Sequence, residues 1–133
     1  MKETDRIRHL SLALRVFALV FAFGVYPLTV LWSSGWCWNP GQSEYLQMII
    51  GIYTTLGAFL WLASNDPEKH RSLISFTIWS SIVHASVMAV HSFKTPQYIG
   101  HLYGDVPALF IVAAVLGWLS PHALTLKLNT NAA

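Results

Sequence analysis

SLISFTIWSSIVHASVMAVHSF, residues 72–93, contains no Asp, Glu, Lys or Arg. A helix that crosses a bilayer needs roughly 20 mostly apolar residues, because it rises about 1.5 Å per residue through about 30 Å of hydrocarbon. Three further windows of similar or greater length also lack charged residues: 16–43, 45–65 and 106–126. The sequence therefore predicts an all-α integral membrane protein with four spanning helices.

The overall composition agrees with this class. Of the 133 residues, 54% are hydrophobic and only 11% are charged, which is too few charges to cover a soluble globule of this size. We expect a single transmembrane domain over residues 1–133, because four spans leave only short connections. Short connections make successive helices antiparallel neighbours in a four-helix bundle. The expected helices cover about residues 11–33, 44–64, 71–93 and 103–120.

The basic residues predict how the bundle sits in the membrane. Of the eight Lys and Arg residues, only Lys94 falls in a loop on the side opposite the termini. Cytoplasmic loops carry an excess of Lys and Arg. We therefore expect both termini in the cytoplasm, with the loops 33–43 and 94–100 on the outer side. This orientation predicts a multi-pass protein of the cell inner membrane, in contact with the lipid bilayer.

Composition also argues against two classes of site. The formal net charge is only +2 and the basic residues are dispersed among the helix ends, so no basic stripe is present that could bind nucleic acid. Cys37 is the single cysteine, which excludes an internal disulfide and any CxxC redox or zinc motif.

Glycine and proline residues bear on helix packing. Gly24 and Pro27 predict a kink or an early end of the first helix. Gly100 and Gly104 match the GxxxG pattern of helix packing, but they lie at the membrane edge in an expected loop. We therefore assign this pair no packing role.

Polar or soft residues of the window 72–93 recur at helical spacing. They follow one another at intervals of four or three residues: Thr77, Ser81, His84, Met88 and His91. At about 100° per residue, this row falls on one face of a helix. Lipid would make such a face costly, so we expect it to face the bundle interior.

The second and fourth helices carry polar residues near the same end of the bundle. The row on the second helix is Glu44, Gln47, Gly51, Thr55 and Ala58. At the start of the fourth helix, His101 and Asp105 would stack on one side if both are helical. Alternatively, Asp105 caps this helix and His101 lies in the preceding loop, in which case the two do not stack.

Together these rows predict an outward-facing polar pocket with a deeper histidine. His84 would lie about 10 Å below the other groups, close to mid-membrane, where ionisable residues are costly and often functional. A structural hydrogen bond between helices is the alternative role for His84, and simple hydration is the alternative for the interfacial histidines. The expected lining is Glu44, Gln47, His84, Met88, His91, His101 and Asp105.

A metal ion or haem would be compatible with part of this set. Imidazole nitrogen and carboxylate oxygen suit zinc, iron, manganese or copper, and the candidate ligands are His84, His91, His101 and Asp105. No HExxH and no di-iron ExxH pair is present, so the spacing does not identify a metal. Haem ligation by His84 or His91 is a further alternative, because one histidine suffices for an axial position.

A resemblance to a known family rests on the second helix and the turn after it. Gly51-Ile52-Tyr53 and Leu56-Gly57-Ala58, followed by an Asp66-Pro67 turn, resemble the small DoxX-like four-helix bacterial membrane proteins. The resemblance covers most of the chain and implies the four-helix membrane fold. Some DoxX-like proteins are linked to quinone-coupled sulfur oxidation, but no catalytic residue of that family maps onto a position of this chain.

The leading functional hypothesis is binding of a small ligand, such as a quinone, a lipid headgroup or a metal, in the polar pocket. The alternative is a non-catalytic accessory subunit of a larger membrane complex. Its partner contacts would be the small residues Ser81, Ala85 and Ala89, or Gly51 and Ala58. An enzyme is the least favoured reading, because no set of nucleophile, base and orienting group can be traced.

Overall fold

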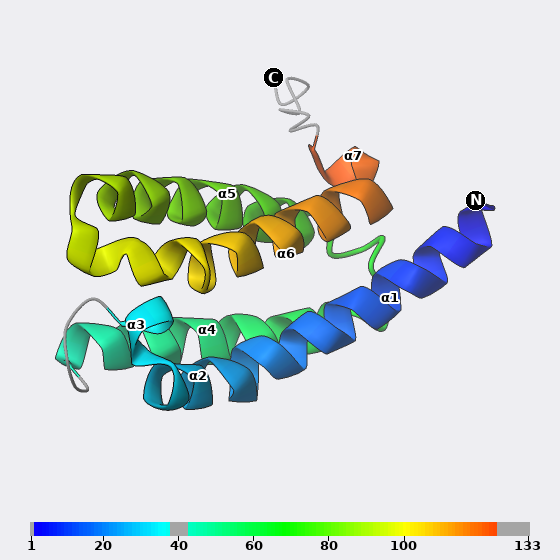
Figure 1. The fold of residues 1–133 in the computed structure, drawn as a ribbon. Coiled ribbons are helices and arrows are strands. Elements are labelled where there is room, and N and C mark those ends of the chain that lie inside the picture. The colour runs from blue at the N-terminus through cyan, green and yellow to red at the C-terminus, as the bar shows by residue number, and fades with distance from the viewer. Residues whose placement is uncertain (1, 38–42, 125–133) are drawn as a thin grey trace, which may run out of the picture.

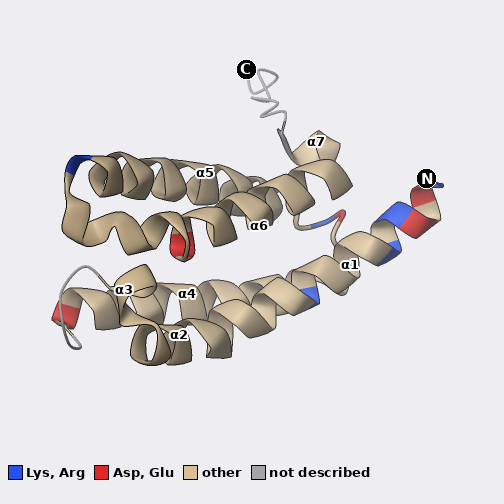
Figure 2. Ribbon diagram, in the orientation of Figure 1, with Lys and Arg blue, Asp and Glu red and all other residues tan. Residues whose placement is uncertain are grey.

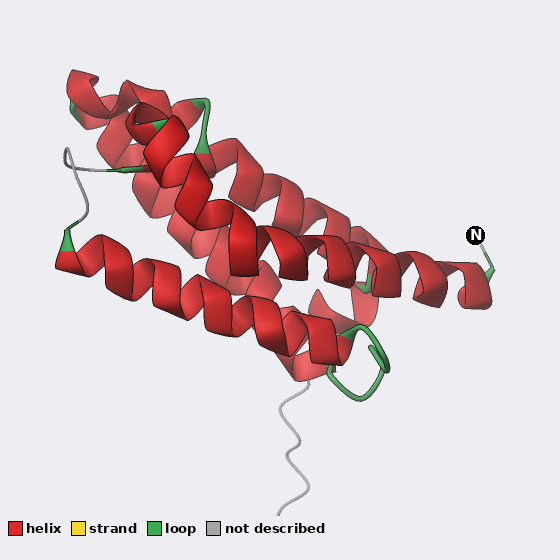
Figure 3. Cartoon of the chain, turned by 90° about the horizontal axis from the view of Figure 1, so that it is seen from below, coloured by secondary structure: helices red, strands yellow, loops and turns green. Residues whose placement is uncertain are grey.

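A computed structural model of the chain describes residues 2–37 and 43–124. These residues form helices and short connections, with no strand among them (Figure 3). The elements, in order, are α1 (Glu3–Leu19), the π-helix η1 (Val20–Gly24), α2 (Val25–Leu31), α3 (Ser33–Trp36), α4 (Glu44–Ala63), α5 (Arg71–Lys94), the 3₁₀-helix η2 (Pro96–Leu102), α6 (Asp105–Leu119) and α7 (Pro121–Leu124) (Figure 1).

Four stretches are long and apolar enough to cross a membrane: Glu3–Leu31, Glu44–Ala63, Arg71–Lys94 and Pro96–Leu119. The predicted all-α fold with four spans is confirmed, and the chain is a multi-pass membrane protein. The helix that forms the first span begins at Glu3 and not near residue 11. Hydropathy does not identify its early turns because they are polar, and they carry an ion pair between Arg6 and Glu3. The fourth span begins with the 3₁₀-helix and not near residue 103.

The helices pack as two pairs (Figure 1). α1, η1 and α2 lie against α4, and α5 lies against α6 and η2. α1 also contacts α6 and so joins the two pairs. α4 and α5 follow each other in the sequence, yet they hardly contact each other. This spacing leaves room inside the bundle.

The apolar core lies toward the end of the bundle that carries the start of α1 and the α4–α5 turn, here called the terminal end. Leu14, Leu60, Ile74 and Leu116 are fully buried there, one from each spanning helix. Large side chains on the outer surfaces are exposed, including Trp118. Such exposure is expected where the neighbour is lipid and not water.

Charged residues gather at the terminal end, on the first turns of α1 and in the α4–α5 turn (Figure 2). The ammonium of Lys69 lies 2.8 Å from an Asp66 carboxylate oxygen and lowers the pKa of that carboxyl. Nearby, Arg15 Nε donates to Ser64 Oγ over 3.3 Å and ties α1 to the end of α4. The middles of the spans are nearly free of charge, as a hydrocarbon environment requires.

The first span changes geometry where Gly24 and Pro27 predicted an irregularity. The backbone N–H of Val25 donates to the Val20 carbonyl, which is the wider bond pattern of a π-turn. Pro27 has no N–H to offer the carbonyl four residues before it, so the regular ladder is interrupted here. The helix nevertheless continues to Leu31, so the expectation of an early end is wrong.

Gly100 and Gly104 form a packing contact at the opposite end, here called the η2 end. A Cβ atom at Gly100 would clash with the Ser34 carbonyl group, and one at Gly104 would clash with the Gly35 carbonyl group. The expectation that this GxxxG pair has no packing role is therefore wrong. The pair allows η2 and the start of α6 to touch the backbone of α3, which joins the two helix pairs at this end.

Candidate functional site

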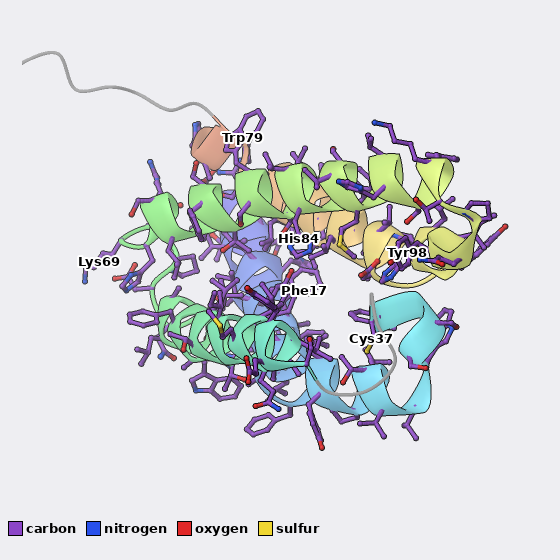
Figure 4. All side chains as sticks on the ribbon, turned by 90° about the vertical axis from the view of Figure 1, so that its left-hand side faces the viewer. Phe17, Cys37, Lys69, Trp79, His84 and Tyr98 are labelled. Atoms are coloured by element: carbon purple, nitrogen blue, oxygen red, sulfur yellow. The ribbon has the colours of Figure 1, made fainter. Side chains whose placement is uncertain are left out.

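A cavity of about 620 Å³ lies between the two helix pairs. Its size falls within the range of roughly 300–1,000 Å³ that is typical of ligand pockets. The walls come from every spanning helix and from α3, and they are mostly apolar. Figure 4 shows Phe17 and His84 directed into the space between the pairs, whereas Trp79 is directed away from it.

The cavity is elongated along the bundle axis. On the first span its lining runs from Val16 to Thr29, a distance of about 20 Å at the usual helical rise. Along α4 the lining runs from the N-cap residue Ser43, at the η2 end, to Tyr53 near the middle of the helix. The space is therefore long enough for an extended hydrocarbon chain.

A hydrogen-bonded pair marks the middle of the cavity wall. The Tyr53 hydroxyl oxygen and His84 Nδ1 lie 3.0 Å apart and join α4 to α5. Both residues line the cavity. The Tyr53 ring also packs against Phe21 of the π-turn, with ring centroids 5.2 Å apart. This contact ties the irregular segment of the first span to the same pair.

A second polar group stands at the η2 end of the cavity. His101 Nδ1 lies 2.9 Å from Asp105 Oδ2, and both residues are buried. Only Asp105 of the two lines the cavity. Trp36 and Cys37 line the same end, and Cys37 Sγ donates to the Thr29 carbonyl over 3.4 Å.

Burial and charge both act on the Cys37 thiol. Partial burial raises its pKa above the ordinary value of 9.0, and the negative charge of Asp105 raises it further. Cys37 and Asp105 both line the cavity, so this charge acts on a nearby thiol. At neutral pH Cys37 therefore remains a protonated thiol.

Family comparison gives a match over nearly the whole length. The model of a family of unknown function, DUF6632, matches residues 5–130. The chain belongs to this family. No curated protein and no solved structure shows a significant match to it. Membership in DUF6632 therefore supplies no activity, and the resemblance to the DoxX-like proteins stays a prediction.

The structure of this DUF6632 chain brings together part of the predicted site. His84, Met88 and Asp105 line the cavity, and His101 supports Asp105 from behind. His101 lies in η2 and Asp105 begins α6, so both residues are helical, and their side chains meet across the junction of the two elements, as one alternative expected. The competing expectation, in which Asp105 caps α6 and His101 lies in a loop, is wrong, since Gly104 occupies the N-cap position and His101 is in a 3₁₀-helix.

The polar row on α4 faces away from the cavity. Glu44, Gln47, Gly51, Thr55 and Ala58 are all exposed. Neither Glu44 nor Gln47 is among the residues that line the cavity, so the expectation that they line the pocket is wrong. α4 packs on the first span through its opposite face, where Gly57 lies against the backbone of Ala18 and Ala22. This close contact fixes the rotation of α4 about its axis and turns the polar row outward.

His91 also lies outside the cavity. The row on α5 is buried or half-buried from Thr77 to Met88, but His91 is exposed. The reason is that α5 packs on α6 through a neighbouring face that includes Ala85 and Ser92, so the polar row lies at the edge of the contact. The expected inward direction of His91 is wrong.

The four expected metal ligands do not assemble. Among residues 2–37 and 43–124, no group of three or more His, Cys, Asp or Glu side chains is placed to hold a metal ion. His91 is exposed, while His84 pairs with Tyr53 and His101 pairs with Asp105. The set His84, His91, His101 and Asp105 therefore does not form the metal site that the sequence allowed.

The sequence prediction missed most of the cavity lining, including Tyr53, Trp36 and Cys37. A signal for Tyr53 exists, because Tyr53, Gly57, Leu60 and Ser64 recur four, three and four residues apart and mark the packed face of α4. That row alternates bulky residues with small ones and contains little polarity, so it lacks the polar pattern by which an inward face is predicted. Trp36 ends a one-turn helix and Cys37 follows it, in a segment too short for periodicity to identify.

Proposed function

We propose that this protein binds one elongated amphiphile inside the membrane, in the cavity between its two helix pairs. The observation that carries the proposal is a mostly apolar space of about 620 Å³ whose wall holds a few polar groups, among them the Tyr53–His84 pair and Asp105. Ligand sites commonly combine apolar walls with a few such placed polar groups. A long tail would occupy the apolar part, and a polar head would reach one of these groups.

A quinone and a membrane lipid are the two candidate amphiphiles. Both are present in bilayers and both combine a long hydrocarbon tail with a compact polar head. The weak contact between α4 and α5 supports entry from the lipid, because these helices can separate without breaking a large interface. The DoxX-like resemblance supports a quinone, since some of those proteins are linked to quinone-coupled chemistry.

The orientation in the membrane is part of the proposal. The terminal end carries the charged first turns of α1 and the α4–α5 turn, and Lys94 stands at the η2 end. The excess of basic residues at the terminal end supports a cytoplasmic location for both termini in the cell inner membrane. The polar end of the cavity, with Asp105, would then face outward.

Co-purification tests the binding proposal. The wild-type protein is purified in mild detergent, the bound small molecules are extracted with solvent, and they are identified by mass spectrometry. We expect one enriched amphiphile at near-equal stoichiometry, reduced several-fold in His84→Ala. His91→Ala is the matched control, because it removes the same side chain from an exposed position of the same helix. Equal retention by both variants, or no enriched species in wild type, would contradict the proposal.

A second candidate function is an accessory subunit that contacts a partner through α4. A Cβ atom at Gly51 would meet no neighbouring atom within 4 Å, and Ala58 is exposed on the same helix, so this small-residue surface is open. Ser81 and Ala85 cannot serve as partner contacts, because both are buried inside the bundle. Purification in mild detergent distinguishes the two functions. A stoichiometric protein partner that is lost in Gly51→Leu would favour the subunit.

A further inference from the structure

One polar atom of the cavity wall is open to a ligand. His84 uses its ring nitrogen Nδ1 for the Tyr53 hydroxyl, at 3.0 Å. Its other ring nitrogen, Nε2, has no hydrogen-bond partner among the described residues, and the surrounding protein does not close it off. The side chain lines the cavity and is directed into the space between the helix pairs (Figure 4). Nε2 is therefore free to meet a polar atom of the bound molecule.

Several other polar side chains of the wall are already engaged within the protein. Thr29 and Cys37 donate to carbonyl groups of the first span, at 2.7 and 3.4 Å. The Ser43 hydroxyl accepts from the backbone at the start of α4. One carboxylate oxygen of Asp105 lies 2.9 Å from His101, and the surrounding protein closes off the other. The imidazole is thus better placed than these groups to recognise a head group.

The Tyr53 hydroxyl determines which imidazole nitrogen carries the proton. A neutral imidazole has one donor nitrogen and one acceptor nitrogen, and a hydrogen bond at one of them fixes the role of the other. A phenol O–H is a good donor, and an imidazole nitrogen is a stronger acceptor than a phenol oxygen. This chemistry assigns the Tyr53 hydroxyl as the donor to Nδ1, which leaves the ring proton on Nε2. The wall then presents an N–H donor to the cavity.

Neighbouring contacts hold this donor in position. The Phe21 ring packs on the Tyr53 ring, with centroids 5.2 Å apart. Gly57, one turn after Tyr53, fixes the rotation of α4 through its contact with the backbone of the first span. On α5, Ala85 directly follows His84 and is fully buried in a cluster with residues of α6. Both partners of the hydrogen bond therefore stand on packed parts of their helices.

The depth of the imidazole restricts the charge of the head group. α5 runs from Arg71 to Lys94, so His84 lies thirteen residues from one end and ten from the other. These separations correspond to about 20 Å and about 15 Å along the helix. No Lys or Arg lines the cavity in the part of the chain that the structure describes. A charged head group at this depth would be costly, whereas an uncharged one would not.

From this arrangement we infer that the cavity selects an amphiphile whose head is an uncharged carbonyl group. The carbonyl oxygen accepts a hydrogen bond from His84 Nε2, and Tyr53 acts as a positioning residue that keeps the proton on this nitrogen. A quinone and an uncharged ester lipid share this chemistry. The inference rests on the proposed binding function and adds to it the class of head group and the residue that recognises it.

Three probes with the same saturated tail test the head group. A long-chain methyl ketone accepts a hydrogen bond, and the 2-methyl-1-alkene has the same shape without an acceptor. The corresponding carboxylate accepts but carries a negative charge. Each is titrated into the full-length protein in nanodiscs of zwitterionic lipid, and empty nanodiscs give the partition background. We expect the ketone to show saturable binding about tenfold tighter than the alkene or the carboxylate.

Two further probes distinguish the sources of the carbonyl. One carries a benzoquinone ring on the same tail, and the other carries a methyl ester. We expect the probe that resembles the natural ligand to bind at least as tightly as the ketone, and the tighter of the two identifies the source. If neither binds more tightly than the alkene, the inferred carbonyl head is wrong.

Variants of the histidine assign the preference to its N–H group. In His84→Leu, which keeps an apolar side chain of moderate size but no donor, the gap between ketone and alkene should shrink to below about threefold. His84→Gln retains an N–H donor on its side chain and should preserve more of the gap. His91→Leu is the control, because it makes the same substitution at an exposed position of α5. Its gap should equal that of wild type.

A vibrational measurement tests the positioning role of Tyr53. The carbonyl stretch of the ketone, labelled with carbon-13, should lie at lower frequency in the wild-type protein than in His84→Leu, because a hydrogen bond weakens the C=O bond. In Tyr53→Phe the proton is no longer held on Nε2, so part of the band should move to higher frequency. A purely structural role of Tyr53 would lower stability without moving this band.

The outcomes separate this inference from the proposed function. If none of the probes binds saturably, the binding function itself fails. If the ketone and the alkene bind with equal affinity, or the carboxylate binds most tightly, the cavity holds amphiphiles but the carbonyl preference is wrong. The wild-type ranking alone decides this, so the inference stays testable even if a variant fails to fold. Unchanged selectivity in a folded His84→Leu protein would also overturn it.

Discussion

The Tyr53 hydroxyl and His84 Nδ1 lie 3.0 Å apart and connect two helices that otherwise hardly touch. α4 and α5 are consecutive, yet the main contacts of α4 are with the first span and those of α5 are with α6 and η2. The hydrogen bond therefore spans the separation between the two helix pairs. Its position in the cavity wall links the stability of the bundle to the space that a ligand would fill.

Removal of this hydrogen bond should weaken the bundle moderately. Hydrogen bonds between transmembrane helices contribute about 0.6 kcal/mol on average and at most about 2 kcal/mol. We expect Tyr53→Phe to lower the free energy of unfolding in mixed micelles by about 1 kcal/mol. Tyr26→Phe provides the control, because Tyr26 is exposed on α2 and does not line the cavity. Equal stability of the two variants would show that the bond does not hold the helix pairs together.

The glycine contact at the η2 end should tolerate substitution far less well than the open glycine of α4. Gly104→Ala forces a Cβ against the Gly35 carbonyl, and overpacking of this kind costs about 1–3 kcal/mol. Gly51→Ala meets no atom within 4 Å and replaces a glycine inside a helix, which favours the folded state by up to about 1 kcal/mol. Thermal unfolding in detergent should therefore move in opposite directions for the two variants. A Gly104→Ala protein as stable as wild type would contradict the contact.

The fold class followed from hydropathy, because helical spans are imposed by the bilayer itself and need no knowledge of packing. Charge-free windows located all four spans. Rotation of each helix about its axis did not follow in the same way. Polar residues at helical spacing identify the inward face of α5 as far as Met88. On α4 the same rule predicts that the polar row faces inward, whereas that row is exposed.

The error on α4 has a physical cause. Its packed face is chosen by Gly57, which admits the backbone of the first span at close range, and the exposed row is only weakly polar apart from Glu44 and Gln47 near its end. A row of small residues can lie against lipid at little cost. Close glycine packing is therefore the stronger signal at Gly57, and again at Gly104, which belongs to the GxxxG pattern at the membrane edge.

The reactivity of the single cysteine should report the charge of Asp105. Burial and that charge raise the pKa of Cys37, so less thiolate is present at a given pH than in a free cysteine. Alkylation by a small maleimide should be slower than that of a cysteine peptide at pH 8, and its rate should increase as pH rises through the raised pKa. Asp105→Asn removes the charge, so its rate profile should shift to lower pH. An unchanged profile would show that Asp105 does not act on the thiol.

The same cysteine can test the proposed orientation. Cys37 follows α3 at the η2 end of the bundle, opposite the terminal end. A membrane-impermeant maleimide should label it in sealed vesicles that keep the cellular orientation and should not label it in inverted vesicles. Permeabilised vesicles provide the control for accessibility. Labelling only in inverted vesicles would reverse the proposed topology.

A larger side chain inside the cavity should weaken ligand binding without lowering the stability of the protein. Ala108 lines the cavity and is only partly buried, so the side chain of Ala108→Phe has space to enter the cavity. Added apolar volume that fills existing space without strain generally stabilises a protein, whereas overpacking costs about 1–3 kcal/mol. We therefore expect Ala108→Phe to unfold at or above the wild-type temperature and to retain at least about tenfold less of the amphiphile that co-purifies with the wild-type protein. Ala58→Phe adds the same side chain on the exposed face of α4 and should leave binding unchanged. If the folded Ala108→Phe protein still retained the amphiphile at the wild-type level, the ligand would have to occupy another part of the molecule.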